Sequence, residues 1–161
     1  MKGMILTEKF AVKKGGGYIV IVGCGRLGAY LANTLSNLGE SVIVVDKDES
    51  AFRKLSPSFG GIVIAGDATE ITVLNDAEIE KATAVVTVTN NDNTNIMVAQ
   101  LAKEIFSIGQ VIARLYDPEC ECVYHEFGIE TICPAVLSMK EIDKLLPAIP
   151  LGVMDGEGET E

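Results

Sequence analysis

The sequence predicts an α/β domain, built on a doubly wound parallel sheet of six strands with helices on both faces. Strand-like apolar runs alternate with helical patterns along the chain, which is the rhythm of a parallel sheet. The apolar runs are continuous, as is typical of strands buried on both faces. A glycine-rich turn follows the first run, where such folds bind ligands. The 161 residues suffice for one domain but not for a second, substrate-binding domain.

Six runs rich in β-branched residues are expected to form the strands. They are Tyr18–Val22, Ser41–Val45, Gly61–Ala65, Ala84–Thr89, Gln110–Leu115 and Glu130–Ile132. The helical patterns are Arg26–Leu38, Glu49–Ser56, Ile71–Asn75, Asn93–Phe106, Pro118–Phe127 and Ser138–Leu146. Gly39, Gly109 and Gly128 follow three of these patterns, and glycine is a common signal for the end of a helix.

Residues 18–147 are expected to form the domain, between a basic N-terminal extension (1–17) and an acidic, glycine-rich tail (148–161). The 13 basic and 23 acidic residues give a net charge of −10, which disfavours nucleic-acid binding. No run approaches the roughly 18 apolar residues of a membrane span, so direct membrane insertion is not expected. The N-terminus lacks the pattern of a signal peptide, and the cysteines match no secreted disulfide framework; we therefore expect a cytoplasmic protein with reduced thiols.

The first predicted strand runs into the turn GCGRLG, which comprises Gly23, Cys24, Gly25, Arg26, Leu27 and Gly28. Gly23 allows a tight turn, Gly25 lets backbone amides approach a phosphate, and Gly28 permits close packing of helix on strand. The helix beginning near Arg26 offers free N–H groups and the positive end of its dipole to an anion. This turn therefore predicts a phosphate-binding site.

Asp46 ends the second predicted strand, 23 residues after Gly23, in the position from which a carboxylate binds ribose hydroxyls. Its charge would repel a 2′-phosphate, so NAD or an unmodified adenine nucleotide is favoured over NADP. The Arg26 guanidinium can reach phosphate oxygens in two-pronged fashion. The alternatives are a structural turn with a surface aspartate, and a solvated arginine near a helix start.

Polar residues also follow the third and fifth predicted strands. Asp67 and Thr69 can contact an adenine amine or cap the next helix. Arg114 lies inside an apolar strand, which calls for a partner such as an anionic ligand or the nearby Glu119.

The fourth predicted strand ends in a polar cluster, TVTNNDNTN. Thr89, Asn90 and Asn91 can line the ribose and phosphate side of the cleft. A polar loop with Asp92 as the N-cap of the next helix explains the same residues equally well.

Common catalytic signatures are missing. The sequence has no Tyr-x-x-x-Lys pair, P-loop or Gly-x-Ser-x-Gly elbow, and we expect no His, Lys or Tyr proton donor in the cleft. The only histidine, His125, lies on the helix after the fifth strand. Cys120, Cys122 and His125 could ligate zinc, but Cys-x-Cys places the two sulfurs on different helix faces; a packed or interface helix is favoured and no metal is expected.

Taken in order, six segments resemble the TrkA-N (RCK/KTN) nucleotide-binding domain of Trk/Ktr potassium uptake regulatory proteins, over about Tyr18 to Leu146. They are IVIVGCGRLGAYLANTL, VIVVDKDES, VIAGDAT, AVVTVTNNDNTNIMVAQLAK, VIARLYDPE and GIETICPAVLSMKEI. The resemblance implies that the GCGRLG turn contacts phosphates, Asp46 and Lys47 the ribose, and Asp67, Ala68 and Thr69 the adenine. Asn91 and Arg114 would lie by the phosphates.

The resemblance further implies a regulatory protein that is not an enzyme and binds NAD(H) or ATP/ADP. It would dimerise through its last helices, with an octameric ring as the larger assembly, on an integral-membrane potassium transporter at the inner membrane. The usual second ligand-binding lobe is expected to be absent, because the chain ends soon after the last predicted helix. The alternatives are a small NAD-dependent oxidoreductase with a site completed by a dimer partner, and an oligomerisation module with a vestigial site.

Overall fold

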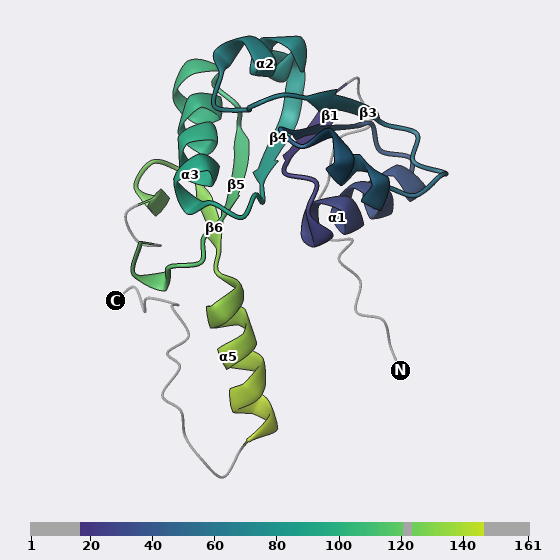
Figure 1. Cartoon of the computed structure of the whole chain (residues 1–161). Helices are drawn as coiled ribbons and strands as arrows, with labels where there is room; N and C mark the ends of the chain where they lie inside the picture. Colours follow the sequence, from purple (N-terminus) through teal and green to yellow (C-terminus); the bar gives the residue numbers. More distant parts are fainter. Residues whose placement is uncertain (1–16, 121–123, 147–161) are drawn as a thin grey trace.

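The computed structural model describes residues 17–120 and 124–146, which form one parallel sheet of six strands in the order β3-β2-β1-β4-β5-β6 (Figure 1). The strands are β1 (Tyr18–Val22), β2 (Val42–Asp46), β3 (Ile62–Ala65), β4 (Ala82–Thr87), β5 (Gln110–Arg114) and β6 (Glu130–Ile132). The strand order reverses between β1 and β4, which creates a topological switch point there. The predicted doubly wound, Rossmann-like fold is therefore confirmed.

Helical segments join the strands. They are α1 (Arg26–Asn37), η1 (Glu49–Lys54), α2 (Ile71–Asp76), η2 (Ile79–Lys81), α3 (Asp92–Gln100), η3 (Leu101–Ile105), η4 (Pro118–Cys120) and α5 (Pro134–Leu145). The segments η1, η2 and η4 are 3-10 helices, and η3 is a π-helical turn that continues α3. Residues 121–123 of the predicted helix Pro118–Phe127 lie outside the described residues.

Two predicted helices differ from the structure in instructive ways. The segment expected as an α-helix at Glu49–Ser56 is the 3-10 helix η1, because Asp48 accepts the Ser50 N–H at 2.9 Å and sets a tight first turn. The last helix begins at Pro134, four residues before the predicted start. Proline fits the first turn of a helix, where its missing N–H leaves no hydrogen bond unmade.

The two faces of the sheet are covered by different helices (Figure 1). On one face Ala29 and Ala32 of α1 and Ala51 of η1 pack against alternate residues of β1, β2 and β4. On the other face, Leu74 of α2 and Val98 of α3 pack against the remaining residues of the same strands and of β5. The central strands β1 and β4 are therefore buried on both faces, as their continuous apolar runs predict.

Strand β3 does not follow that prediction. Its Ile62 and Val63 are 60% and 44% exposed. β3 is an edge strand that pairs only with β2. The short 3-10 helix η1 packs against β2 and α1.

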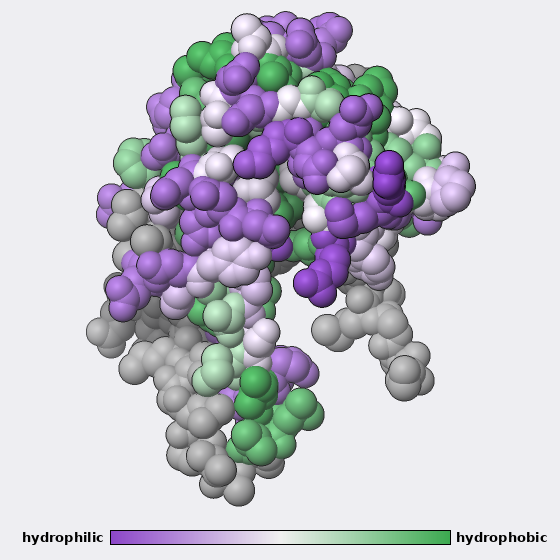
Figure 2. Space-filling model, viewed as in Figure 1, coloured by the Kyte–Doolittle hydropathy of each residue, from purple (hydrophilic) through white to green (hydrophobic). Residues whose placement is uncertain are grey.

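Helix α5 projects away from the rest of the domain (Figure 1) and contains no buried residue. Its exposed apolar side chains include Leu137, Ile142 and Leu145. Figure 2 shows hydrophobic surface toward the C-terminal end of this helix. Among the helices that the structure describes, none is long and apolar enough to cross a membrane.

Candidate functional site

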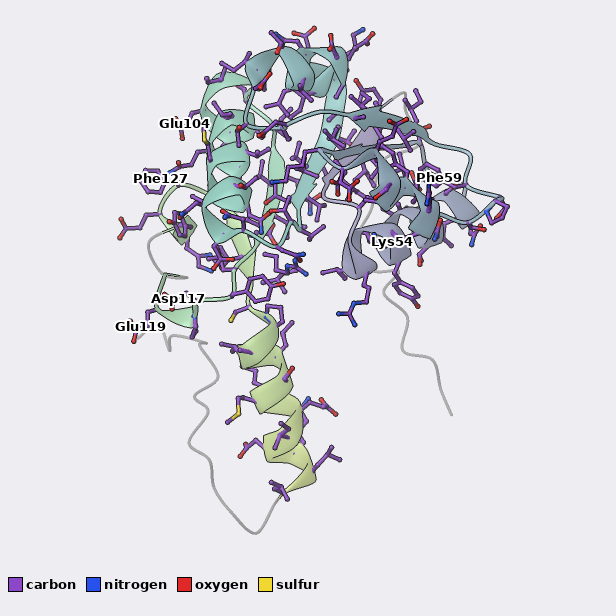
Figure 3. The ribbon with its side chains drawn as sticks, in the orientation of Figure 1. Lys54, Phe59, Glu104, Asp117, Glu119 and Phe127 are labelled. Carbon is purple, nitrogen blue, oxygen red and sulfur yellow. The ribbon has the colours of Figure 1, made fainter. Side chains whose placement is uncertain are left out.

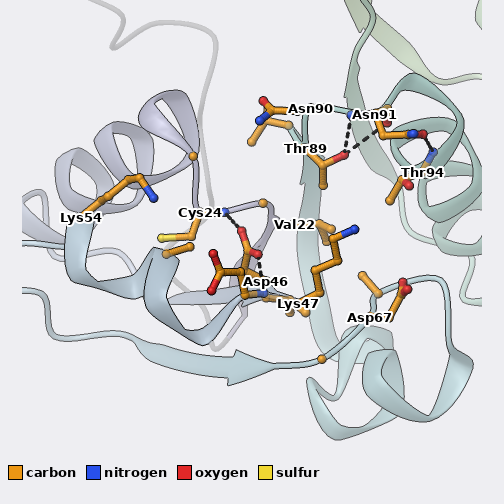
Figure 4. A pocket seen from close by; sticks show the side chains of 18 residues that line it. Val22, Cys24, Asp46, Lys47, Lys54, Asp67, Thr89, Asn90, Asn91 and Thr94 are labelled. Atoms are coloured by element: carbon orange, nitrogen blue, oxygen red, sulfur yellow. Dashed lines mark hydrogen bonds between the residues drawn. The ribbon is translucent and has the colours of Figure 1, made fainter.

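A cavity of about 340 Å³ opens at the carboxyl ends of β1, β2 and β4, at the switch point of the sheet (Figure 4). Many of the residues predicted to bind a ligand line it. These are Gly23, Cys24, Gly25, Asp46, Lys47, Asp67, Ala68, Thr89, Asn90 and Asn91. The structure thus brings together side chains from four separate strand ends.

The glycine turn is closely packed at two of its three glycines. Gly23 has φ +104°, and a Cβ there would lie 2.8 Å from the Thr89 nitrogen. A Cβ on Gly28 would lie 1.8 Å from the Gly23 carbonyl oxygen. Around Gly25, by contrast, no described residue other than its two chain neighbours has an atom within 4 Å of the Cβ position. The tight-turn role of Gly23 and the close-packing role of Gly28 follow directly from this geometry.

Helix α1 begins directly behind this turn without a side-chain cap. Gly25 is its N-cap, and the first turn contains no acidic residue. The first N–H groups of a helix have no partner within the helix, and they carry the positive end of its dipole. This end of α1 is therefore suited to an anion.

Asp46 joins the glycine turn to the end of β2. One carboxylate oxygen accepts the Cys24 N–H at 2.6 Å, and the other accepts the Asp48 N–H at 2.9 Å (Figure 4). Asp46 therefore fixes the turn, while each oxygen keeps a second lone pair. The Cys24 thiol is buried, and burial together with the Asp46 charge raises its pKa, which keeps it protonated.

The opposite wall of the cavity is the segment after β4. Asn91 is the N-cap of α3 and accepts the Thr94 N–H at 2.9 Å. The expectation that Asp92 is the N-cap is wrong. The Asp92 carboxylate instead accepts the N–H groups of Tyr116, at 2.8 and 3.0 Å, and of Asp117, at 3.2 Å, and so ties α3 to the segment after β5.

Arg114 does not line the cavity. Its Nη2 donates to the Thr89 carbonyl oxygen at 2.7 Å and to the Asn90 Oδ1 at 3.1 Å. Its guanidinium also lies over the Tyr116 ring, 4.8 Å from the centroid, as a cation–π contact. These contacts, rather than an ion pair with Glu119, account for its placement; Glu119 lies at the outer edge of η4 (Figure 3).

Asp67 and Thr69 form a local turn before α2. The Asp67 Oδ1 accepts both the Thr69 N–H, at 2.9 Å, and the Thr69 hydroxyl, at 2.7 Å. These hydrogen bonds to the ionised form lower the pKa of Asp67. Asp67 lines the cavity and Thr69 does not. The N-cap of α2 is Glu70, without a side-chain cap bond, so neither residue caps that helix.

Several predicted site residues lie next to the cavity rather than on its wall. They are Arg26, Leu27, Gly28, Thr69 and Arg114. Arg26 is the first residue of α1 and its side chain is exposed.

Sequence reasoning missed other lining residues. They are Val22, Val45, Asp48, Ala51, Lys54, Gly66, Val88 and Thr94. Lys54 matters most, because η1 brings its side chain to the cavity (Figure 4). Two lysines therefore line the cavity: Lys47, which the family resemblance places at the ribose, and Lys54, where no lysine proton donor was expected. No motif marks Lys54, whose position depends on the path of η1.

The zinc alternative involves Cys120, Cys122 and His125. Cys122 lies outside the described residues, as does the Cys120 side chain. His125 is exposed, and its Nε2 lies 3.3 Å from the Thr131 hydroxyl of β6, away from the cavity. Within residues 17–120 and 124–146, no three His, Cys, Asp or Glu side chains gather to hold a metal ion.

The fold and this crevice are those of the doubly wound domains that bind nucleotides. The TrkA-N domain family matches residues 19–134, and the chain belongs to that family.

Its relatives are potassium uptake proteins. The chain is 40% identical to the Trk system potassium uptake protein TrkA of Streptomyces coelicolor, over 81% of this chain and 59% of the relative. It is 32% identical to the TrkA homolog of Methanothermobacter thermautotrophicus, over 89% of this chain and 68% of the relative. The chain thus spans about 60–70% of the length of these relatives.

Solved structures share the fold. The TrkA-N domain of the Escherichia coli inner membrane protein ybaL has a TM-score of 0.73 at 18% identity, covering 83% of this chain and 98% of that one. The GsuK channel bound to NAD has a TM-score of 0.63, and GsuK bound to ADP 0.64. Both are 18% identical and cover 77% of this chain, and 22% and 33% of theirs.

Proposed function

We propose that this protein is a nucleotide-sensing regulatory subunit of a potassium uptake system, and that its cavity binds an adenine nucleotide, either NAD(H) or ATP/ADP. The observation that carries the proposal is the uncapped start of α1 beside a glycine turn that Asp46 holds open to the cavity. Phosphate binds at such helix starts because their N–H groups and dipole favour negative charge. The names of the relatives supply the link to potassium uptake.

The ligand would cross the cavity from β3 toward β4. The adenine would lie near Asp67 and Ala68, and the ribose hydroxyls would donate to the free lone pairs of Asp46. The first phosphate would lie over Gly25, where the protein leaves the Cβ position open. Lys47, Lys54 and Arg26 would offset the negative charge of the phosphates and of the nearby carboxylates.

The remainder of the ligand would reach Thr89, Asn90 and Asn91, beside Arg114. NAD(H), ATP and ADP would place different groups against this wall. A sensor needs ligands that contact its two conformational states differently, because only such a difference shifts the balance between the states. Arg26 would respond to the number of phosphates extended toward it.

The output would go to an integral-membrane potassium transporter on the cytoplasmic side of the inner membrane. The exposed apolar face of α5 fits an interface between two copies of the chain, with an octameric ring as the larger assembly. GsuK, a channel that contains a region of this fold, has structures with NAD and with ADP, which supports nucleotide control of a membrane pore.

The test is a set of thermal unfolding curves with NAD, NADH, ATP, ADP and AMP. A ligand that binds only the folded state raises the melting temperature by mass action. We expect a shift with at least one of these nucleotides. Arg26→Ala should reduce the shift most for the ligand with the most phosphates. Arg53→Ala is the matched control, because Arg53 is also an exposed arginine but lies in η1 rather than at the start of α1.

Two outcomes would reject the proposal. One is the absence of any shift at millimolar nucleotide. The other is substrate-dependent oxidation of NADH at catalytic rates, which would identify the protein as a small oxidoreductase. If Arg26→Ala reduces the melting-temperature shift equally for ATP, ADP and NADH, only the proposed response of Arg26 to the number of phosphates is rejected.

A further inference from the structure

We propose that Asn95, a residue outside the cavity wall, is a positioning residue that sets the β4 side of the nucleotide site. Asn95 lies in the first turn of α3 and is fully buried. A buried amide needs hydrogen-bond partners for all its donors and acceptors. The partners of the Asn95 side chain are Thr89 and Arg114, two of the predicted site residues.

The Asn95 side chain forms three hydrogen bonds with Thr89. Its Oδ1 accepts the Thr89 N–H at 2.8 Å and the Thr89 hydroxyl at 2.7 Å. Its Nδ2 donates to the Thr89 carbonyl oxygen at 3.0 Å. Three polar groups of one cavity residue are thus held by one side chain. Thr89 is also the residue against which Gly23 packs, so its position bears on both walls of the cavity.

The second Nδ2 hydrogen bond of Asn95 extends this control to β5. It goes to the Arg114 carbonyl oxygen at 2.9 Å. Arg114 in turn donates to the Thr89 carbonyl oxygen and to Asn90 Oδ1. Asn95 therefore fixes the backbone from which Arg114 reaches back to Asn90, and one amide determines the placement of Thr89, Asn90 and Arg114 together.

This inference rests on the proposed nucleotide site and predicts which part of a ligand is affected. AMP ends with its single phosphate at the glycine turn, on the side of the cavity formed by β1, β2 and β3. NAD and ATP extend farther, toward Thr89 and Asn90. Loss of Asn95 should therefore weaken binding of the longer ligands and leave AMP nearly unchanged.

The experiment measures dissociation constants by calorimetry for AMP and for the longer ligand, NAD or ATP, that the unaltered chain binds. The variants are Asn95→Ala and the milder Asn95→Ser, whose hydroxyl is too short to span Thr89 and Arg114. Thr87→Val is the matched control. Thr87 is equally buried on β4 and its hydroxyl donates to the Asn95 and Ile112 carbonyl oxygens, but it does not line the cavity.

We expect the Asn95 variants to weaken the longer ligand about tenfold, the equivalent of one or two net hydrogen bonds, and AMP less than about twofold. Thr87→Val should change neither affinity by more than about twofold. This should hold even if Thr87→Val lowers the melting temperature as much as the Asn95 variants do. Circular dichroism at the titration temperature establishes that each protein is folded.

Equal losses for AMP and for the longer ligand would overturn the inference, as would a loss in Thr87→Val as large as in the Asn95 variants. If Asn95→Ala does not fold, Asn95→Ser decides between these results. Failure of the proposed function is distinct, because the unaltered chain would then bind none of the nucleotides.

Discussion

The two walls of the cavity are held in place by different means. On the β1 side, the glycine turn is fixed by close backbone packing, since Gly28 meets the Gly23 carbonyl and Gly23 meets Thr89 with no room for a methyl group. The Asp46 carboxylate also accepts the Cys24 N–H of this turn. On the β4 side, the wall is fixed by side-chain hydrogen bonds from Asn95 and Arg114. The β1 wall therefore has no room for an added atom at Gly23 or Gly28, whereas the β4 wall depends on side-chain hydrogen bonds.

This difference separates the effects of substitutions on stability from their effects on binding. Changes at the tightly packed glycines should unfold or displace the turn. Changes at Gly25, where the protein leaves open space, should act on the ligand alone. The expected loss of stability decreases from Gly28→Ala through Asp46→Ala to Gly25→Ala.

Gly28→Ala should have the largest effect. The new Cβ would lie 1.8 Å from the Gly23 carbonyl oxygen, so α1 and the end of β1 must separate. We expect a loss of about 3 kcal/mol or more in the free energy of unfolding, despite the better helix propensity of alanine. The free energy of unfolding of both proteins is measured by urea unfolding. A loss below about 1 kcal/mol would show that the β1 wall yields more easily than its packing indicates.

Asp46→Ala should have an intermediate effect. The Cys24 and Asp48 N–H groups would lose their carboxylate acceptor, at a cost of about 1–3 kcal/mol in the free energy of unfolding. Nucleotide affinity should fall as well, because the ribose loses its acceptor. Asp46→Asn keeps one acceptor oxygen. Its free energy of unfolding in urea should therefore lie between that of the unaltered chain and that of Asp46→Ala. An unchanged stability in Asp46→Ala would contradict the part of Asp46 in holding the turn.

Gly25→Ala should have the smallest effect on stability, within about 1 kcal/mol of the unaltered chain. Its φ of −73° suits any residue, and no described residue other than its two chain neighbours has an atom within 4 Å of the new Cβ. The methyl group would instead occupy the space proposed for the phosphate, so nucleotide affinity should fall at least about tenfold. Paired unfolding and binding measurements make the comparison. An unchanged nucleotide affinity in Gly25→Ala would show that the phosphate does not bind at this turn.

Sequence reasoning predicted the parts of the site that depend on local backbone geometry. The roles of Gly23 and Gly28 follow from the spacing of the turn, and the place of Asp46 follows from the end of a strand. It missed Asn95 and Lys54. Asn95 reads as one of several polar residues in a helix start, and its importance arises from hydrogen bonds to residues on two strands. Lys54 reaches the cavity only because η1 turns back over β2.

The partner of Arg114 shows the same limit. Its charge in an apolar strand indicated that a partner was needed, but the partners are Thr89, Asn90 and the ring of Tyr116, which lies two residues farther along the chain. The path of the chain after β4 brings Thr89 and Asn90 within reach, and no local pattern records that path.

The sequence by itself determined the alternation of strands and helices, the glycine turn and the family. These features rest on hydrophobic period and on backbone conformation, which act between residues close in the chain. The tertiary structure alone decided that β3 is exposed, that Lys54 lines the cavity and that Asn95 hydrogen-bonds to both Thr89 and Arg114. Those features depend on which strand ends meet at one edge of the sheet, where hydrogen bonds and packing join residues far apart in the chain.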